Sequence, residues 1–79
     1  QNVPNPFRSS TTIAFQLPEA GPATLTITDV SGKVVRVLEG EYSAGFHEVE
    51  LRDLNATGLL YYQLSTPSYT ATRRMIRLR

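Results

Sequence analysis

The chain has 79 residues, and its eight basic and seven acidic side chains give a net charge of +1, with no cysteine. A chain of this length forms one small domain that buries about 60–65% of the surface that its unfolded state exposes. The lack of cysteine excludes a disulfide-bonded scaffold, a thiolate nucleophile and a cysteine metal ligand, so the core alone must stabilise the fold.

Residues 1–7 contain two prolines, Pro4 and Pro6, which cannot donate a backbone hydrogen bond to a neighbouring strand. We therefore expect this segment to be either an edge strand or a polyproline-like entry segment, with the side chain of Phe7 anchoring it to the core. The chain begins with glutamine rather than methionine, so we expect it to be one domain of a longer protein.

Two segments with clear alternation follow, at residues 11–17 and 23–30. Apolar side chains occupy every second position in each of them, which is typical of an antiparallel strand with one solvated face. Their apolar faces consist of Ile13, Phe15 and Leu17 in the first segment and Ala23, Leu25 and Ile27 in the second. Because only the turn signal at residues 18–22 separates the two strands, we predict that they form a hairpin.

The middle of the chain predicts two more strands. Asp29–Lys33 is typical of a tight turn, because its glycine permits a positive φ, and a strand at residues 34–38 follows. The apolar residues of that strand do not keep a period of two, which predicts either burial on both faces or a β-bulge. We expect a loop at residues 39–45, a strand at 46–51, and Leu54 packed against the bottom of the core.

The last third of the chain predicts a strand at residues 58–64, a turn at 66–68 and a final strand at 70–79. Residues 1–53 carry four basic and seven acidic side chains, a net of −3, whereas residues 54–79 carry four basic and no acidic ones. We expect these halves to attract each other weakly over a short range. The basic residues are Arg73, Arg74, Arg77 and Arg79, and they stand among the apolar residues Met75, Ile76 and Leu78.

These patterns predict an all-β fold, namely an immunoglobulin-like antiparallel β-sandwich of about seven strands without a disulfide. Two sheets packed face to face would share one layer of apolar side chains. We expect this layer to contain Ile13, Phe15, Leu25, Ile27, Val35, Leu38, Val49, Leu51, Leu60, Tyr62 and Leu64. The cysteine pair and the core tryptophan of antibody domains are both missing from the sequence.

Side chains that carry enzyme chemistry are scarce. His47 is the only histidine, and no serine, cysteine or carboxylate accompanies it at a recognisable spacing. Glu48 and Glu50 alternate with apolar residues, as on a solvated strand face, and a small sandwich offers them no cleft. We therefore expect no enzyme activity, no catalytic residue, no cofactor and no metal. We also expect no membrane span, because no apolar run reaches the ~18 residues that one needs.

Two groups of side chains remain as possible binding surfaces. The aromatic residues Phe46, Tyr61 and Tyr69 would form a platform for sugar rings if they were coplanar, but such residues also pack across strands. The four C-terminal arginines would suit phosphate groups, but charges on a terminal edge strand also prevent edge-to-edge aggregation. We favour cross-strand packing for the aromatic residues and expect no nucleic acid partner.

Several short motifs, in this order and spacing, resemble the type A C-terminal sorting domain of the bacterial type IX secretion system. The resemblance covers essentially the whole chain and extends in part to the immunoglobulin-like portion of flagellar hook-capping proteins. The motifs are Asn5-Pro6-Phe7, Thr11-Thr12-Ile13-Ala14-Phe15-Gln16-Leu17-Pro18, Asp29-Val30-Ser31-Gly32-Lys33-Val34-Val35, Ala44-Gly45-Phe46-His47-Glu48-Val49, Gly58-Leu59-Leu60-Tyr61-Tyr62-Gln63-Leu64 and Ala71-Thr72-Arg73-Arg74-Met75.

This resemblance implies an immunoglobulin-like domain that follows an N-terminal passenger, is recognised by the outer-membrane secretion machinery and is then usually removed by a sortase. The passenger would travel through the periplasm and the outer membrane to the cell surface or the medium. By position, the candidate recognition residues are Pro4, Asn5, Pro6 and Phe7, then Gly58, Tyr61 and Tyr62, and then Arg73 and Arg74. The alternative function is a structural or carbohydrate-binding accessory module of an extracellular enzyme.

Overall fold

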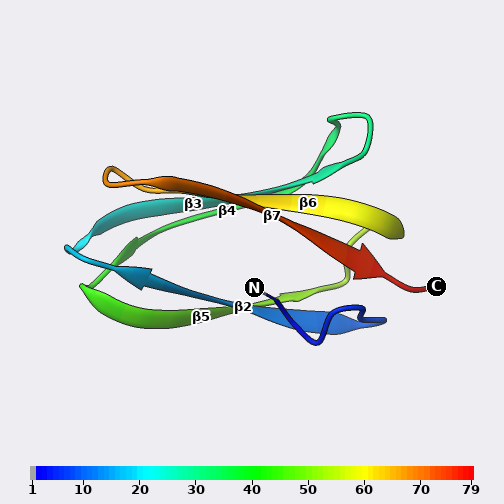
Figure 1. The fold of residues 1–79 in the computed structure, drawn as a ribbon, viewed down its shortest axis with the longest axis horizontal. Coiled ribbons are helices and arrows are strands. Elements are labelled where there is room, and N and C mark those ends of the chain that lie inside the picture. Colours follow the sequence, from blue (N-terminus) through cyan, green and yellow to red (C-terminus); the bar gives the residue numbers. More distant parts are fainter. Residues whose placement is uncertain (1) are drawn as a thin grey trace.

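Seven strands in two antiparallel sheets make up the fold of residues 2–79, which are the residues that the computed structural model describes (Figure 1). One sheet has three strands in the order β1-β2-β5, and the other has four in the order β4-β3-β6-β7. The predicted immunoglobulin-like sandwich is thereby confirmed. The strands are β1 (Asn2–Val3), β2 (Ser10–Leu17), β3 (Gly21–Asp29), β4 (Val34–Tyr42), β5 (Gly45–Arg52), β6 (Gly58–Ser65) and β7 (Thr70–Arg77).

The core lies between the two layers and is built by the period-two alternation of each strand (Figure 1). Most of the predicted core residues are buried, and Leu54 is also buried, as predicted. Val35, Leu38 and Val49 are only partly buried, because β4 and β5 are edge strands of their sheets. The buried apolar residues are Phe7, Ile13, Phe15, Leu17, Ala23, Leu25, Ile27, Leu51, Leu54, Leu60, Tyr62, Leu64 and Met75.

The predicted hairpin between residues 11–17 and 23–30 is wrong. β2 pairs along its whole length with β5, from Ser10 opposite Arg52 to Leu17 opposite Gly45, whereas β3 lies between β4 and β6 in the other sheet. The segment between β2 and β3 therefore connects the two sheets. Alternation did not distinguish these arrangements, because strands of one hairpin and strands of two facing sheets both direct every second side chain into the core.

The loop predicted at residues 39–45 is also wrong, since β4 continues to Tyr42 and pairs with the start of β3. A Cβ atom added at Gly40 would lie only 3.2 Å from the ring of Tyr42, so this glycine makes room for a side chain and does not mark a loop. The predicted β-bulge is confirmed. Ile27 pairs with Arg36 and Thr28 with Val34, which leaves one extra residue in β4.

The predicted turn at Asp29–Lys33 is confirmed, and Asp29 organises it. Its carboxylate accepts hydrogen bonds from the backbone N–H of Ser31 at 2.9 Å, the hydroxyl of Ser31 at 2.6 Å and the N–H of Lys33 at 3.0 Å. Gly32 has a φ of 89°, which a residue with a side chain rarely adopts. The turn is therefore fixed by one carboxylate and one glycine.

We expect the pKa of Asp29 in the folded protein to lie below its ordinary value, chiefly because the Ser31 hydroxyl donates to the ionised carboxylate. Since the folded-state pKa is depressed, the stabilisation is complete above the unfolded-state pKa and is lost as the pH falls through the folded-state pKa. An NMR titration of the Asp29 carboxyl carbon measures this value. Ser31→Ala should move it back toward the ordinary value, and a pKa at or above that value in the parent protein would contradict the assignment.

Candidate recognition surface

The N-terminal segment, Asn2–Arg8, contacts the edges of both sheets. Its first two residues form β1 and pair with β2, after which the chain crosses to the outer edge of β7. There the N–H of Phe7 donates to the carbonyl of Ile76 at 3.0 Å, and the N–H of Leu78 donates to the carbonyl of Phe7 at 2.7 Å. The segment predicted at an edge therefore closes part of one sandwich side.

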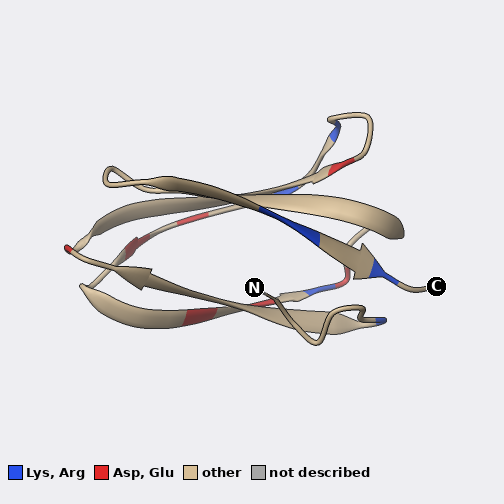
Figure 2. Cartoon of the chain, in the orientation of Figure 1, with Lys and Arg blue, Asp and Glu red and all other residues tan. Residues whose placement is uncertain are grey.

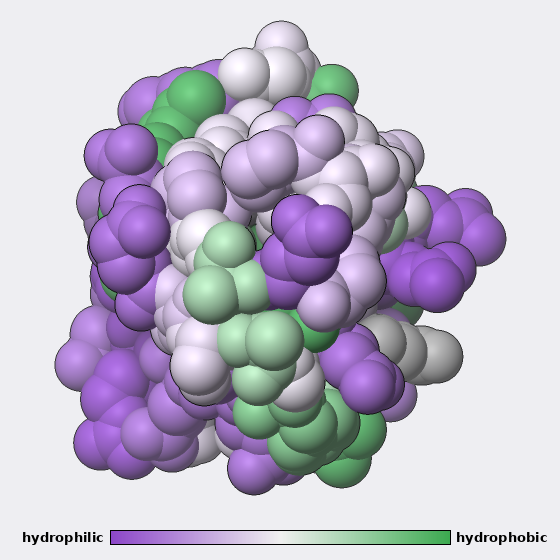
Figure 3. All heavy atoms as spheres, turned by 90° about the vertical axis from the view of Figure 1, so that its left-hand side faces the viewer, coloured by the Kyte–Doolittle hydropathy of each residue, from purple (hydrophilic) through white to green (hydrophobic). Residues whose placement is uncertain are grey.

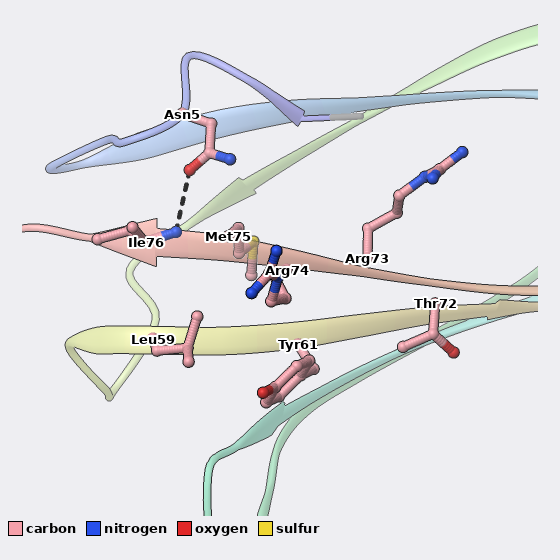
Figure 4. Close-up of a pocket in the computed structure, with 8 residues that line it drawn as sticks. All are labelled: Asn5, Leu59, Tyr61, Thr72, Arg73, Arg74, Met75 and Ile76. Carbon is pink, nitrogen blue, oxygen red and sulfur yellow. Dashed lines mark hydrogen bonds between the residues drawn. The ribbon is translucent and has the colours of Figure 1, made fainter.

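Side chains of this segment reinforce both attachments. Phe7 is 2% exposed and packs in the core, as predicted, while the Oδ1 atom of Asn5 accepts a hydrogen bond from the N–H of Ile76 at 3.0 Å (Figure 4). Asn2 and Thr11 are both buried, and each donates a side-chain hydrogen bond to the carbonyl of Pro4, at 3.1 and 2.7 Å. The sequence analysis missed this pair, although Thr11 is in phase with the buried residues of β2.

The structure brings the three predicted groups of recognition residues together around β7. β6 and β7 are antiparallel neighbours, with Gly58 opposite Arg77, Tyr61 opposite Arg74 and Tyr62 opposite Arg73. β7 slants toward the N-terminal segment, so that residues from both ends of the chain lie side by side (Figure 1). Gly58 opens β6 with a φ of 85°, a backbone conformation that favours glycine.

The two tyrosines of β6 have different surroundings. Tyr61 is half-buried on the outer face of the four-stranded sheet, next to Arg74, and its ring is accessible to a partner (Figure 4). Tyr62 is only 3% exposed and belongs to the core, where burial raises the pKa of its hydroxyl and the nearby Arg73 guanidinium opposes the shift. Only Tyr61 of this pair is therefore placed for direct contact with a partner.

The C-terminal arginines also differ in their surroundings. The guanidinium group of Arg77 donates to the carbonyls of Arg8 at 2.9 Å and Ala56 at 3.1 Å, so it ties β7 to two loops. Arg73 and Arg74 are exposed and form no ion pair within residues 2–79. Figure 2 shows the basic residues along β7, and residues 54–79 contain no acidic side chain. These two arginines consequently have positive charge available for a partner.

An open groove of about 610 Å³ runs over the outer side of β6 and β7 (Figure 4). Its apolar part includes Leu59 and Ile76, which are 37% and 43% exposed. A groove that combines apolar, aromatic and cationic groups suits a peptide partner better than a small uncharged molecule. The lining residues are Asn5, Leu59, Tyr61, Thr72, Arg73, Arg74, Met75 and Ile76.

The aromatic platform considered for sugar binding is not present. Phe46 lies on the outer face of β5 and Tyr61 on the outer face of β6, so they belong to opposite surfaces of the sandwich. Tyr69 follows the turn before β7, and its hydroxyl donates to the carbonyl of Gln16 at 2.8 Å. At the end of the molecule seen in Figure 3, hydrophobic residues form a narrow strip among hydrophilic ones rather than a broad flat surface.

His47 has surroundings typical of a strand residue. Its ring lies 5.5 Å from the ring of Phe15 and 5.0 Å from that of Tyr42, and its Nε2 atom is 2.7 Å from the carbonyl oxygen of Ser43. Within residues 2–79, no group of three or more His, Cys, Asp or Glu side chains is arranged to hold a metal ion. In the same part of the chain, no helix has the length and apolar character required to cross a membrane.

Three comparisons with known proteins were made, and one of them identifies the family of the chain. Searches of curated proteins and of solved structures find no match to the chain. In contrast, the family model described as "Secretion system C-terminal sorting domain" matches residues 3–77, which includes the N-terminal segment from Val3 and all of β2 to β7. The chain therefore belongs to the family of secretion system C-terminal sorting domains, the signals of type IX secretion.

Proposed function

We propose that this domain is a non-catalytic signal that directs an N-terminal passenger through the type IX secretion system to the cell surface or the medium, by way of the periplasm and outer membrane. The family match over residues 3–77 supports this function. One structural observation links this function to particular residues: the N-terminal segment, β6 and the basic strand β7 all contribute to one groove. The partners are the outer-membrane secretion machinery and then a sortase.

The groove is suited to recognition because it forms only in the folded domain. Asn5 and Ile76 are 71 positions apart in the sequence, and their hydrogen bond exists only when the two sheets have packed. The adjacent Arg73 and Arg74 place two charges beside an apolar surface, an arrangement that speeds encounter with an acidic partner and disfavours a basic one. The secretion machinery would thus recognise a folded surface rather than a linear peptide.

The candidate recognition residues have separate roles in this proposal. Asn5 and Phe7 hold the N-terminal segment against β7, while Pro4 and Pro6 lie on either side of Asn5 in the bends between β1 and Phe7 and restrict the backbone there. Gly58 sets the start of β6, and Tyr62 supports β7 from the core. The direct contacts are made by Tyr61, Arg73 and Arg74.

A carbohydrate-binding accessory module is less well supported, because the aromatic residues that would have formed its platform lie on separate faces. The sortase would act after export, on the connection between the passenger and this domain. We infer that the cut falls before Asn2, since beyond this residue the chain is held in a sheet. The domain itself supplies no catalytic group in this scheme.

A reporter fusion tests the proposed function. Residues 1–79 placed after an exported reporter should carry it to the surface or the medium of a type IX-competent bacterium. The double variant Arg73→Glu/Arg74→Glu should lower the exported fraction by at least about tenfold, because it inverts the charge at the groove. Both side chains are exposed, so we expect each reversal to change the free energy of unfolding by no more than about 0.5 kcal/mol.

The matched control is Arg73→Lys/Arg74→Lys, which keeps the charge and should be exported like the parent fusion. Deletion of Met75–Arg79 is a less informative test, because Met75 is fully buried and the deletion also removes the end of β7 with which Phe7 pairs. Retention of the parent fusion in the periplasm would refute the sorting function. Normal export of a stably folded double-Glu variant would show that the arginines only protect the sheet edge.

A further inference from the structure

β7 is the last strand of its sheet, and the N-terminal segment covers its outer edge only near the C-terminal end, at Ile76. The N–H and carbonyl of Ile76 and the N–H of Leu78 point to that edge and bond to the N-terminal segment. Because alternate residues of a strand direct their backbone groups to the same side, the N–H and carbonyl groups of Thr72 and Arg74 point to this edge as well. Nothing in residues 2–79 pairs with them there.

A pocket lies on each side of the uncovered edge of β7. The open groove of about 610 Å³ lies on the outer side, beside Thr72 and Arg74. On the core side, a cavity of about 180 Å³ separates β7 from β2, with Ala71 and Arg73 on one wall and Phe15 on the other. This second cavity exists because β1 covers only two residues of β2, so the two sheets are not closed here.

The cavity between the sheets has a polar group at its wall. The hydroxyl group of Tyr62 is buried close to the backbone of Asn2 and has no acceptor for its proton within residues 2–79, and Arg73 lies nearby without an acidic partner. Buried hydroxyl groups are normally hydrogen-bonded, so an occupant with an acceptor group would satisfy both side chains. On the other side of the strand, Arg74 offers a second unpaired charge beside the groove.

We propose that the edge of β7 from Thr70 to Arg74 is a docking site for one extended, acidic segment of the secretion machinery, which adds to the four-stranded sheet as a further strand. Such strand addition obtains affinity from backbone hydrogen bonds and specificity from alternate side chains. Here the side chains of the added strand enter the groove and the cavity in turn, and each meets an arginine. This inference rests on the proposed function and specifies the chemistry of the partner.

A second copy of this chain fits the edge less well. Antiparallel pairing of two β7 edges would bring arginines of one copy close to those of the other, and like charges on paired strands are destabilising. A segment with acidic residues at alternate positions has the opposite charge on both faces. Charge therefore selects an acidic partner over self-association.

Amide hydrogen exchange of the free protein first tests whether the backbone N–H groups at the edge of β7 are unpaired. The amides of Thr72 and Arg74 should exchange at least about a hundredfold faster than those of Ala71 and Arg73, whose N–H groups face β6. Equal protection of all four amides would overturn the proposal, because no free donor would remain at the edge. This measurement needs no variant and does not depend on export.

The second measurement uses the reporter fusion with Thr72→Pro, which removes one edge N–H and keeps both arginines. The exported fraction should fall by at least about tenfold, while the control Thr72→Val, which retains the N–H, should be exported normally. Thr70→Pro, at the first residue of β7, serves as a second block if Thr72→Pro does not fold. Failure of the parent fusion would refute the proposed function itself, whereas normal export of a folded proline variant would refute only strand addition.

Discussion

Replacing Phe7 by alanine should lower the free energy of unfolding by about 3–5 kcal/mol, as is typical for loss of a buried aromatic side chain. Phe7 is 2% exposed, and its backbone forms one hydrogen bond with Ile76 of β7 and one with Leu78, just after the strand. The substitution removes the only large side chain that anchors the N-terminal segment to the core, so we expect the backbone pairing to weaken as well. Urea unfolding of the purified domain, followed by circular dichroism, measures the change.

The matched control is Phe7→Leu, which keeps an apolar side chain at the site and should cost less than about 1.5 kcal/mol. Hydrogen exchange supplies a second readout, since the amide of Leu78 should lose protection in Phe7→Ala and keep it in Phe7→Leu. A cost below about 0.5 kcal/mol for Phe7→Ala would show that the segment is held mainly by Asn2, Asn5 and Thr11 rather than by its aromatic anchor.

Replacing Ile27 by alanine should lower the free energy of unfolding by about 2–5 kcal/mol, because the side chain of Ile27 is fully buried under β3. β3 has a neighbour on each side, so the surrounding side chains cannot collapse into the space left by the deletion as they would at an edge. The control is Thr26→Ala, on the outer face of the same strand, which should cost no more than about 1 kcal/mol. Similar costs for both variants would contradict the inward assignment of Ile27.

Phe7→Ala or Ile27→Ala would each remove a large part of the free energy of unfolding of a domain this small. Single domains unfold with a free energy of about 5–15 kcal/mol, and short chains lie toward the lower end because they bury less of their surface. The chain has no cysteine to compensate. For this reason, export measurements on Phe7→Ala or Ile27→Ala would report folding, and surface variants such as Arg73→Glu/Arg74→Glu are needed to report recognition.

The strands and their inward faces could be predicted because each follows a local pattern with a period of two. The pairing of the strands could not be predicted, as the wrong hairpin between β2 and β3 shows. The partner of β2 is β5, whose paired residues are more than 30 positions away along most of the ladder. Gly40 misled for a different reason, because a glycine that accommodates the ring of Tyr42 has the same sequence signal as a loop glycine. The first error concerns contacts between segments that are far apart in the sequence, whereas the second concerns the direction of a side chain only two positions away.

The candidate site was also predicted only in part from the sequence. Its residues were named from resemblance to a family, but their arrangement around β7 became visible only in the fold. Neighbouring residues Tyr61 and Tyr62 look alike in the sequence, and the pleat of the strand separates them into a surface and a core residue. The roles of Asn2 and Thr11 were not predicted, since nothing local indicates that they share the carbonyl of Pro4 as an acceptor.

The double attachment of the N-terminal segment determines how the domain would respond to mechanical tension. A pull applied at Asn2 acts first on the two residue pairs between β1 and β2, and only then on the contacts between Phe7 and β7. These connections are few compared with the eight residue pairs that join β6 to β7. Tension from a passenger would therefore peel away the N-terminal segment and lengthen the exposed edge of β7 while the ladder between β6 and β7 stays intact.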